Sequence, residues 1–252
     1  MDLNLKGKGA IVTGSGGGFG KALAYLLADE GVNVIVHDLP SKKAETDAIV
    51  ADLRAKGVKA EAILADMSDA NAVLDFFNRS IAAFDIDIVV NNAAIWLTDY
   101  VETMSVERYQ KTVDINLIAP FILCREAVNY FREKGKKGKI VNMVSQAAFH
   151  GSTSGHAHYA ATKAGMVSFS VSLARECAKY GINVNCVAPG MMRTPMNAQA
   201  LEEREDEYLK RIPLGRIADP VEVANVVTFL CSEKAGYMTG ATLDVTGGML
   251  MR

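Results

Sequence analysis

Residues 10–20, Ala10-Ile-Val-Thr-Gly-Ser-Gly-Gly-Gly-Phe-Gly20, decide the fold. An apolar run ends at Thr13, a glycine-rich segment follows, and a helical pattern begins near Phe19. A strand, a glycine-rich turn and a helix N-terminus together present free backbone N–H groups and a positive helix dipole to a pyrophosphate. The spacing Gly14-x-x-x-Gly18-x-Gly20 differs from the commoner G-x-G-x-x-G, because Phe19 stands in place of the last glycine. The stretch favours nucleotide binding over a plain flexible turn.

Seven short apolar runs alternate with longer helical patterns along the chain. Continuous apolar runs indicate strands covered on both faces, as in a parallel sheet with right-handed helical crossovers. We therefore predict an α/β fold, a single doubly wound Rossmann domain with a seven-stranded parallel sheet. The expected strands are 10–13, 32–36, 60–64, 86–90, 139–144, 182–187 and 242–245; the expected helices include 19–30, 42–56, 70–83, 107–133 interrupted at Pro120, and 159–180. The last two helices should pack beside each other.

The 252 residues, 50% hydrophobic and 22% charged, can bury a large core without disulfides or metal. We treat 1–252 as one domain. The longest polar stretch, 197–211, has the helix formers of an insertion and lacks the Pro, Gly and Ser typical of a linker. We place it in a helical flap over about 191–215, after the sixth strand.

Charge and cysteine content exclude several classes of function. The 27 basic and 29 acidic side chains leave a formal net charge of −2, without the excess that nucleic-acid binding needs. The four cysteines are widely spaced and form no zinc or redox pair, so no metal site is expected. The N-terminus has no apolar signal region, and no stretch reaches the ~18 apolar residues of a membrane span. We expect a cytoplasmic protein that binds neither nucleic acid nor membrane.

The stretch Tyr159-Ala-Ala-Thr-Lys163 carries the clearest catalytic signal. A tyrosine and a lysine four apart on a helix share one face, so the ammonium favours the ionised phenol and lowers its pKa from about 10. An isolated pair of this kind is ordinarily the start of an amphipathic helix. Here Ser145, fourteen residues upstream, ends an apolar strand, which favours an acid/base site.

Asp38 follows the second strand, at the sheet edge where an adenosine ribose would lie. A carboxylate there accepts hydrogen bonds from both ribose hydroxyls and repels a 2′-phosphate, which favours NAD over NADP. The lack of Arg or Lys between Gly14 and Gly20 favours NAD independently, whereas Lys42 and Lys43 lie near enough to favour NADP. The alternative role for Asp38 is a strand-ending turn.

Two further polar segments follow strands at the same edge. Asp66-Met67 comes after the third strand, and Asn91-Asn92-Ala93-Ala94 comes after the fourth. Asp66 alone fits a helix cap equally well, and Asn91 fits a link between strands. Their shared location favours contact with the cofactor.

Several ordered motifs together resemble the short-chain dehydrogenase/reductase family over residues 8–248. The segment 13–20 resembles its TGxxxGxG signature, 91–93 resembles NNAG, and 189–194 resembles PGxxxT. Asn116, Ser145, Tyr159 and Lys163 align with the family's catalytic tetrad. The resemblance implies a sheet with strand order 3-2-1-4-5-6-7.

The resemblance also implies residue roles. Tyr159 exchanges a proton with the alcohol or ketone, Ser145 holds and polarises its oxygen, Lys163 lowers the pKa of the tyrosine and holds the nicotinamide ribose, and Asn116 positions a water in a proton relay. The implied cofactor contacts are Gly14, Gly18, Phe19, Gly20, Asp38, Asp66, Met67, Asn92, Ala93, Tyr159, Lys163, Pro189, Gly190, Met192 and Thr194.

One position departs from the family pattern. Ala94 stands where NNAG has glycine, and its methyl group crowds the backbone near the cofactor. Substrate contacts are expected from the segments after strands four and five and from the flap, which offer Trp96, Gln146, His150, His156 and Met191. For each histidine or methionine, packing is the competing interpretation.

The general look resembles the 3-oxoacyl-carrier-protein reductase branch, with Pro213-Leu-Gly-Arg216 and 240–248 among the similar segments. We predict an NAD-dependent enzyme that interconverts a secondary alcohol and a ketone. Two alternatives are an NADPH-dependent 3-oxoacyl-carrier-protein reductase and a non-catalytic protein that senses the dinucleotide. The intact tetrad disfavours the sensor. The resemblance further implies a homotetramer.

Overall fold

The computed structural model describes residues 2–152 and 154–252. Its single sheet has seven parallel strands in the order β3-β2-β1-β4-β5-β6-β7, which confirms the predicted class and strand order. The strands are β1 (Gly9–Val12), β2 (Asn33–Val36), β3 (Ala60–Ala62), β4 (Ile88–Asn91), β5 (Gly138–Met143), β6 (Ile182–Pro189) and β7 (Thr242–Val245).

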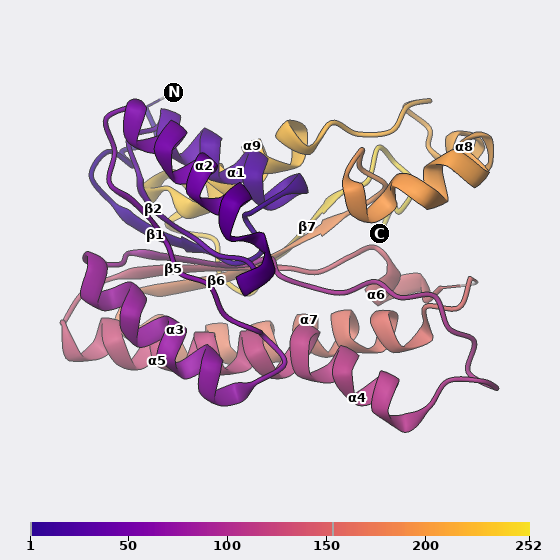
Figure 1. The fold of residues 1–252 in the computed structure, drawn as a ribbon, viewed down its shortest axis with the longest axis horizontal. Coiled ribbons are helices and arrows are strands. Elements are labelled where there is room, and N and C mark those ends of the chain that lie inside the picture. Colours follow the sequence, from indigo (N-terminus) through magenta and orange to yellow (C-terminus); the bar gives the residue numbers. More distant parts are fainter. Residues whose placement is uncertain (1, 153) are drawn as a thin grey trace.

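Helices cover both faces of this sheet, as Figure 1 shows. The helices α1 (Gly18–Asp29), α2 (Lys43–Ala55) and α9 (Pro220–Cys231) lie on one face. The helices α3 (Ala70–Ala83), α4 (Val106–Val113), α5 (Ala119–Glu133) and α7 (Ala157–Cys177) lie on the other. The short α6 (Ala147–His150) and the flap helix α8 (Ala198–Arg211) lie at one end of the molecule.

Alternation along the strands divides the core between the two faces. In β1, Ala10 and Val12 belong to one buried cluster with residues of α1, α2 and α9, whereas Ile11 belongs to a second cluster with residues of α3 and α5. Successive strand side chains point to opposite faces, so a continuous apolar run fills both clusters. This explains why apolar runs without alternation predicted a sheet covered on both sides.

The long helical segment after β4 is interrupted in a different place from the prediction. Residues 114–118 form a π-helical turn between α4 and α5, and Pro120 lies in the first turn of α5 without breaking it. Residues 106–133 are helical without a gap, so Pro120 removes one hydrogen bond of this run, and the π-helical turn directly before it accommodates the break. The predicted interruption at Pro120 is therefore wrong by a few residues. The predicted contact of this segment with α7 is present, since the Phe121 and Phe169 rings are 5.9 Å apart.

The strands end together at one edge of the sheet. In the parallel register Val12 lies beside Val36 and Val90, Asn91 beside Asn142, and Met143 beside Val187. The segments that follow these strands therefore emerge side by side, where ligands of doubly wound sheets bind. Among the described helices, none is long and apolar enough to cross a membrane.

Candidate active site

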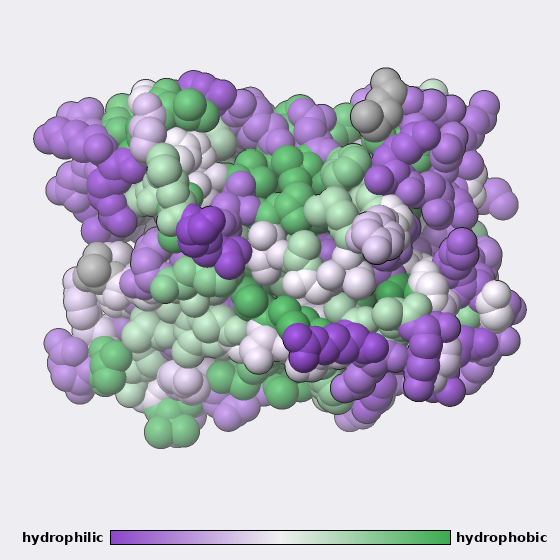
Figure 2. Space-filling view, turned by 180° about the vertical axis from the view of Figure 1, so that it is seen from behind, coloured by the Kyte–Doolittle hydropathy of each residue, from purple (hydrophilic) through white to green (hydrophobic). Residues whose placement is uncertain are grey.

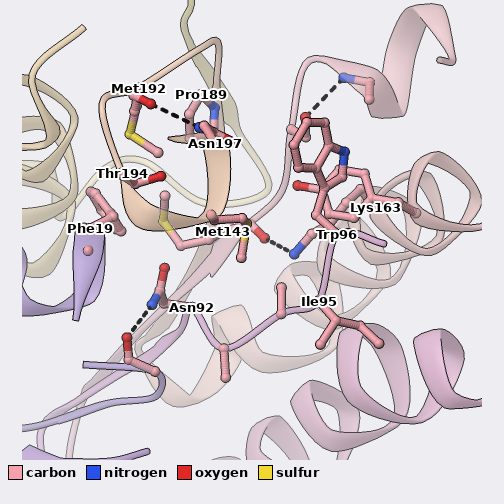
Figure 3. A pocket seen from close by; sticks show the side chains of 18 of the residues that line it. Phe19, Asn92, Ile95, Trp96, Met143, Lys163, Pro189, Met192, Thr194 and Asn197 are labelled. Carbon is pink, nitrogen blue, oxygen red and sulfur yellow. Dashed lines mark hydrogen bonds between the residues drawn. The ribbon is translucent and has the colours of Figure 1, made fainter. Parts of the chain in front are cut away.

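A cavity of about 600 Å³ opens at the carboxyl edge of the sheet, beneath the flap. The glycine-rich turn, the segments after β2 to β6, α7 and α8 all contribute to its lining. Figure 3 shows Phe19, Asn92 and Thr194 on one side and Trp96 and Lys163 on the other. Its size is typical of a small-molecule or cofactor site.

The glycine-rich turn fits a pyrophosphate. Gly17 caps α1 without any side-chain hydrogen bond, so the first N–H groups of the helix are left for a ligand. A Cβ on Gly20 would lie 2.1 Å from the Gly14 carbonyl oxygen, and Gly14 itself has a φ of +65°. A side chain is therefore excluded at both positions, and the backbone can approach a bound dinucleotide closely.

His37 is a cavity residue that the sequence analysis missed. Its Nδ1 accepts a hydrogen bond from the Gly14 N–H at 3.0 Å, and its Nε2 lies 3.2 Å from the Ala65 carbonyl oxygen. Burial lowers the pKa of His37 to about 4, so the neutral ring keeps its proton on Nε2. The ring thereby joins the turn after β1 to the segment after β3. Its place directly before Asp38 was the only available signal.

The two acidic residues at this edge of the sheet, Asp38 and Asp66, differ in the hydrogen bonds that they accept. Asp38 accepts the Leu39 N–H through Oδ1, while its Oδ2 lies only 2.6 Å from where a Cβ on Gly16 would be. Asp66 accepts from the N–H and hydroxyl of Ser68, and the backbone hydrogen bond in particular holds the pKa of Asp66 below its usual range. Asp66 closes a local turn, since the cap of α3 is Asp69. Asp38 keeps an oxygen beside the glycine turn.

The segment after β4 is fastened to the turn after β1. The Asn92 side chain donates to the carbonyl oxygens of Thr13 and Gly14 at 2.9 and 3.1 Å, and the Asn92 N–H donates to the Thr13 hydroxyl. Asn91 bonds to Asn142 instead. Ala94 does not have a positive φ, so its methyl group causes no backbone strain where the family pattern has glycine.

Ser145, Tyr159 and Lys163 lie together in the wall of the cavity. Ser145 follows β5, and its hydroxyl accepts the Ala147 N–H at the start of α6. The Lys163 ammonium donates to the Met143 carbonyl oxygen at 2.8 Å (Figure 3). It lies 5.6 Å from the centre of the Tyr159 ring. A strand end and a helix face thus bring a hydroxyl, a phenol and an ammonium together.

The prediction that Lys163 lowers the pKa of Tyr159 is wrong. Burial raises the pKa of Tyr159 to about 12, and the neighbouring Ser145 hydroxyl only partly offsets it. Burial likewise lowers the pKa of Lys163 to about 8, because desolvation disfavours the charged form of either group. Lys163 is bonded to a backbone carbonyl rather than to the phenol, so its charge does not reverse the effect.

Asn116 lies in the π-helical turn and does not line the cavity. It is fully buried, its Oδ1 accepts the Ile95 N–H at 2.9 Å, and its Nδ2 donates to the Ile95 carbonyl oxygen at 3.0 Å. A weaker bond of 3.4 Å reaches the Thr162 hydroxyl. The side chain therefore ties the segment after β4 to α7, and its part in a proton relay stays a prediction.

His156 does not line the cavity, contrary to its predicted place among the substrate contacts. It is buried behind Trp96, with the two rings stacked 4.3 Å apart, and bonds to Thr98 and Ser154. Burial, with smaller effects of His158 and Arg204, lowers the pKa of His156 to about 4. The packing interpretation therefore holds, and His156 acts on the cavity only by supporting Trp96.

The remaining predicted contacts do meet in one cavity. Every residue predicted to contact cofactor lines it, as do Trp96, Gln146, His150 and Met191 from the predicted substrate set. Several of the residues that sequence reasoning missed come from the flap and the C-terminal segment, because nothing local in the sequence indicates where a flap folds back. They are Asn197, Arg204, Glu207, Tyr208, Arg211 and Met249.

Comparison with known proteins agrees with this geometry. A family profile described as enoyl-(acyl carrier protein) reductase matches residues 14–250. The 3-oxoacyl-[acyl-carrier-protein] reductase of Aquifex aeolicus is 38% identical over 249 residues, covering 99% of this chain and 100% of the relative. The chain belongs to the short-chain dehydrogenase/reductase family. The same-named Vibrio cholerae reductase is 37% identical over 251 residues, with 99% and 100% covered.

Solved structures of the family superpose closely. A blue fluorescent protein from a metagenomic library, in complex with NADPH, has a TM-score of 0.92 at 33% identity, covering 98% of this chain and 100% of that one. A putative NAD(P)-dependent gluconate 5-dehydrogenase from Beutenbergia cavernae, with bound NADP, has a TM-score of 0.93 at 32% identity, covering 99% of both. The chain is thus an oxidoreductase of an NAD(P)-using family. The names of the sequence relatives favour the 3-oxoacyl-carrier-protein reductase alternative over an NAD-linked alcohol dehydrogenase.

The lowered pKa of Lys163 predicts how turnover depends on pH. A charged ammonium stabilises the phenolate that remains when Tyr159 gives up a proton, and Lys163 loses that charge as pH rises through about 8. Turnover that consumes reduced cofactor should therefore fall above about pH 8, and Lys163→Arg should keep activity to higher pH. Steady-state kcat/KM measured from about pH 7 to about pH 10 tests this, with circular dichroism to verify folding. A flat wild-type profile over that range would contradict the prediction.

Proposed function

We propose that this chain transfers a hydride between a nicotinamide dinucleotide and a ketone or secondary alcohol, with Tyr159 as the acid/base group. One observation supports this most strongly: Ser145 and Tyr159 line the same cavity as the glycine-rich turn. That turn suits a pyrophosphate, and the hydroxyl and phenol suit an oxygen on which charge develops. When bound, the nicotinamide supplies or accepts the hydride.

The protonation state of Tyr159 suits reduction. With a pKa near 12 the phenol is protonated at neutral pH, so it can donate to the oxygen of a ketone as alkoxide character forms. The Ser145 hydroxyl donates a second hydrogen bond to the same oxygen and so orients the carbonyl. In the oxidative direction, the tyrosine must first lose its proton. Lys163, whose ammonium lies 5.6 Å from the centre of the ring, stabilises the resulting phenolate when it is charged.

Replacement of Tyr159 by phenylalanine removes the proposed proton donor and keeps the ring. We expect Tyr159→Phe to lower kcat about 10²- to 10⁴-fold, since general acid/base catalysis contributes about that much, with the affinity for NADH nearly unchanged. NADH absorbance measures turnover, and NADH fluorescence titration measures binding. Tyr180→Phe, just beyond α7 and partly exposed, serves as the matched control. If the protein were only a dinucleotide sensor, the wild type and Tyr159→Phe would both bind NADH without turnover. If Tyr159→Phe turned over as fast as the wild type, the acid/base role would be refuted.

NAD(H) is our proposed cofactor, on the strength of Asp38. Its Oδ2 accepts no hydrogen bond from residues 2–152 and 154–252 and lies beside Gly16 in the cavity, where it can accept from a ribose hydroxyl and would oppose a 2′-phosphate. Lys42 also lines this end, but its ammonium pairs with Glu45 at 2.9 Å. The similar structures that hold NADPH or NADP favour the phosphorylated cofactor instead. The charge of this chain's own residues supports NAD(H).

Asp38→Asn tests the cofactor proposal. Wild-type protein should bind NADH more tightly than NADPH, and the variant should narrow that ratio by about 10-fold or more, because it removes the repulsion and a charged hydrogen bond. Dissociation constants for both cofactors, from fluorescence titration, measure the ratio. Asp47→Asn, a solvent-exposed change in α2, is the control. Tighter binding of NADPH by the wild-type protein would reject NAD(H) as the preferred cofactor.

A 3-oxoacyl thioester is the second candidate substrate, supported by the names of the sequence relatives. The cavity wall around the catalytic group combines Trp96 with several methionines and the polar Gln146, which suits a substrate of mixed polarity. Secondary alcohols, polyols, hydroxy acids and 3-oxoacyl thioesters, assayed side by side with either cofactor, would rank the candidates.

We also propose a homotetramer, which exposed apolar residues support. Val106, Tyr109 and Phe121 are exposed along α4 and α5. Figure 2 shows apolar and weakly polar surface across the middle of the face opposite Figure 1, bordered by hydrophilic residues. Such surfaces are typical of interfaces. We expect light scattering to give four times the chain mass of 27.1 kDa, and Phe121→Asp to lower it. A monomer mass for the wild-type protein would rule the tetramer out.

A further inference from the structure

We infer that the substrate carries an anionic group, a carboxylate or a phosphate ester, which Arg204 of the flap binds. This inference rests on the proposed hydride transfer and adds the class of substrate to it. Arg204 lies in α8 and lines the same cavity as Ser145 and Tyr159. Its guanidinium has neither an acidic partner nor a hydrogen-bond acceptor in the part of the chain that the structure describes.

Arg204 has no acidic partner among residues 2–152 and 154–252. Its Nε is buried and has no hydrogen-bond acceptor in that part of the chain. The Tyr208 ring lies 5.9 Å from the guanidinium carbon. A buried donor of a charged group left without an acceptor is costly, whereas an anion brought by a ligand would satisfy it.

Two other arginines near the flap, Arg193 and Arg216, are paired. Arg193 forms a two-point bridge to Glu205 with distances of 2.6 and 3.2 Å, and Arg216 forms one to Glu222 with two distances of 2.6 Å. These pairs are exposed, so solvent would have satisfied the same groups. Arg204 and Arg211 line the cavity, and neither forms an ion pair within the described part of the chain. Of these two, only Arg204 has a buried donor without an acceptor there.

The backbone of α8 is broken at the same residue. Arg204 has a φ of −144° and a ψ of 29°, outside helical values, although α8 contains neither proline nor glycine. A kink without these residues has another cause. Here it coincides with the one α8 residue that places a buried donor group at the cavity.

The charges around Arg204 leave room for an anion. Arg211 adds a second cation to the lining from α8, and Glu207 is the opposing acidic residue there. Lys163 is the remaining cation on the catalytic side, whereas Asp38, Asp66 and Lys42 line the dinucleotide end. Arg204 also contributes, after burial and His158, to the lowered pKa of His156, the residue that is stacked on Trp96.

Gln146 supplies an independent sign of a polar substrate. The residue directly follows Ser145, is 7% exposed and lines the cavity. Its Nε2 donates to the Met249 sulfur at 3.1 Å, while its Oε1 has no partner among the described residues. A hydroxyl or amide N–H of the substrate could donate a hydrogen bond to this oxygen. A purely apolar substrate would leave both Gln146 and Arg204 unsatisfied.

The test compares charged and neutral forms of otherwise matched ketones. The probes are 2-, 3- and 4-keto acids with their methyl esters, dihydroxyacetone phosphate with dihydroxyacetone, and a neutral N-acetylcysteamine thioester of 3-oxobutanoate. We expect at least one anion to exceed its neutral partner in kcat/KM. Arg204→Gln should lower kcat/KM for that anion about 10- to 100-fold, as expected for a charged hydrogen bond, and leave the neutral partner nearly unchanged. Arg204→Lys should restore part of the loss.

Lys210→Gln is the matched control, because it removes one positive charge from the same helix on its exposed side, outside the cavity. It should leave the preference for the anion intact. An equal loss of kcat/KM for the anion and its neutral partner in Arg204→Gln would overturn the inference, as would a neutral thioester preferred over every anion.

A binding measurement separates the anion site from the proposed hydride transfer. Calorimetry measures the binding of the anions to protein saturated with NADH. Anion binding that depends on Arg204 without any turnover would reject the hydride transfer and uphold the anion site; absence of such binding would reject the anion site.

Discussion

The alignment of strand ends in a parallel sheet is the constraint on which the whole site depends. Because β1, β2, β4, β5 and β6 run in the same direction in close register, everything that follows them emerges along one edge. Short hydrogen bonds then lock neighbouring segments: His37 holds the turn after β1, and Asn92 holds it from the other side. Polar side chains that surround the closely packed glycines therefore supply the rigidity of the turn.

Desolvation at this edge sets the chemistry that is available. Burial moves the pKa of Tyr159 up and that of Lys163 down, so both groups are driven toward their neutral forms in the chain itself. Helical spacing brings the phenol and the ammonium onto one face, but spacing says nothing about solvent. The Met143 carbonyl, which ends β5, takes the ammonium's hydrogen bond and so fixes its position behind the ring. A neutral phenol beside Ser145 is the state suited to donating a proton.

How far the sequence could predict each part follows from the range of the interactions involved. Apolar runs and glycine-rich turns depend on neighbours within a few residues. The sheet was therefore predictable, as was the presence of the glycine-rich turn, Asp38 and Tyr159 at the cavity. The position of His156 depended on whether Trp96 would stack on it, a contact between residues 60 positions apart. The π-helical turn, which buries Asn116 against Ile95, likewise depends on tertiary packing. Whether a polar side chain such as His156 or Asn116 is buried or faces the cavity depends on contacts with distant residues, which the neighbouring sequence does not reveal.

The flap forms a structural unit partly separate from the rest of the core. Leu201, Ile212 and Ile217 make a small buried cluster of their own, joined to the cavity wall through Met191 and Met249. The main clusters lie between the sheet and its covering helices and do not include these residues. Changes in α8 can therefore alter which substrate group is bound with little disturbance of the turn, the phenol or the ammonium. An unpaired arginine in such a unit destabilises the flap more than the sheet. A bound anion would offset that destabilisation, so substrate binding would stabilise the folded flap.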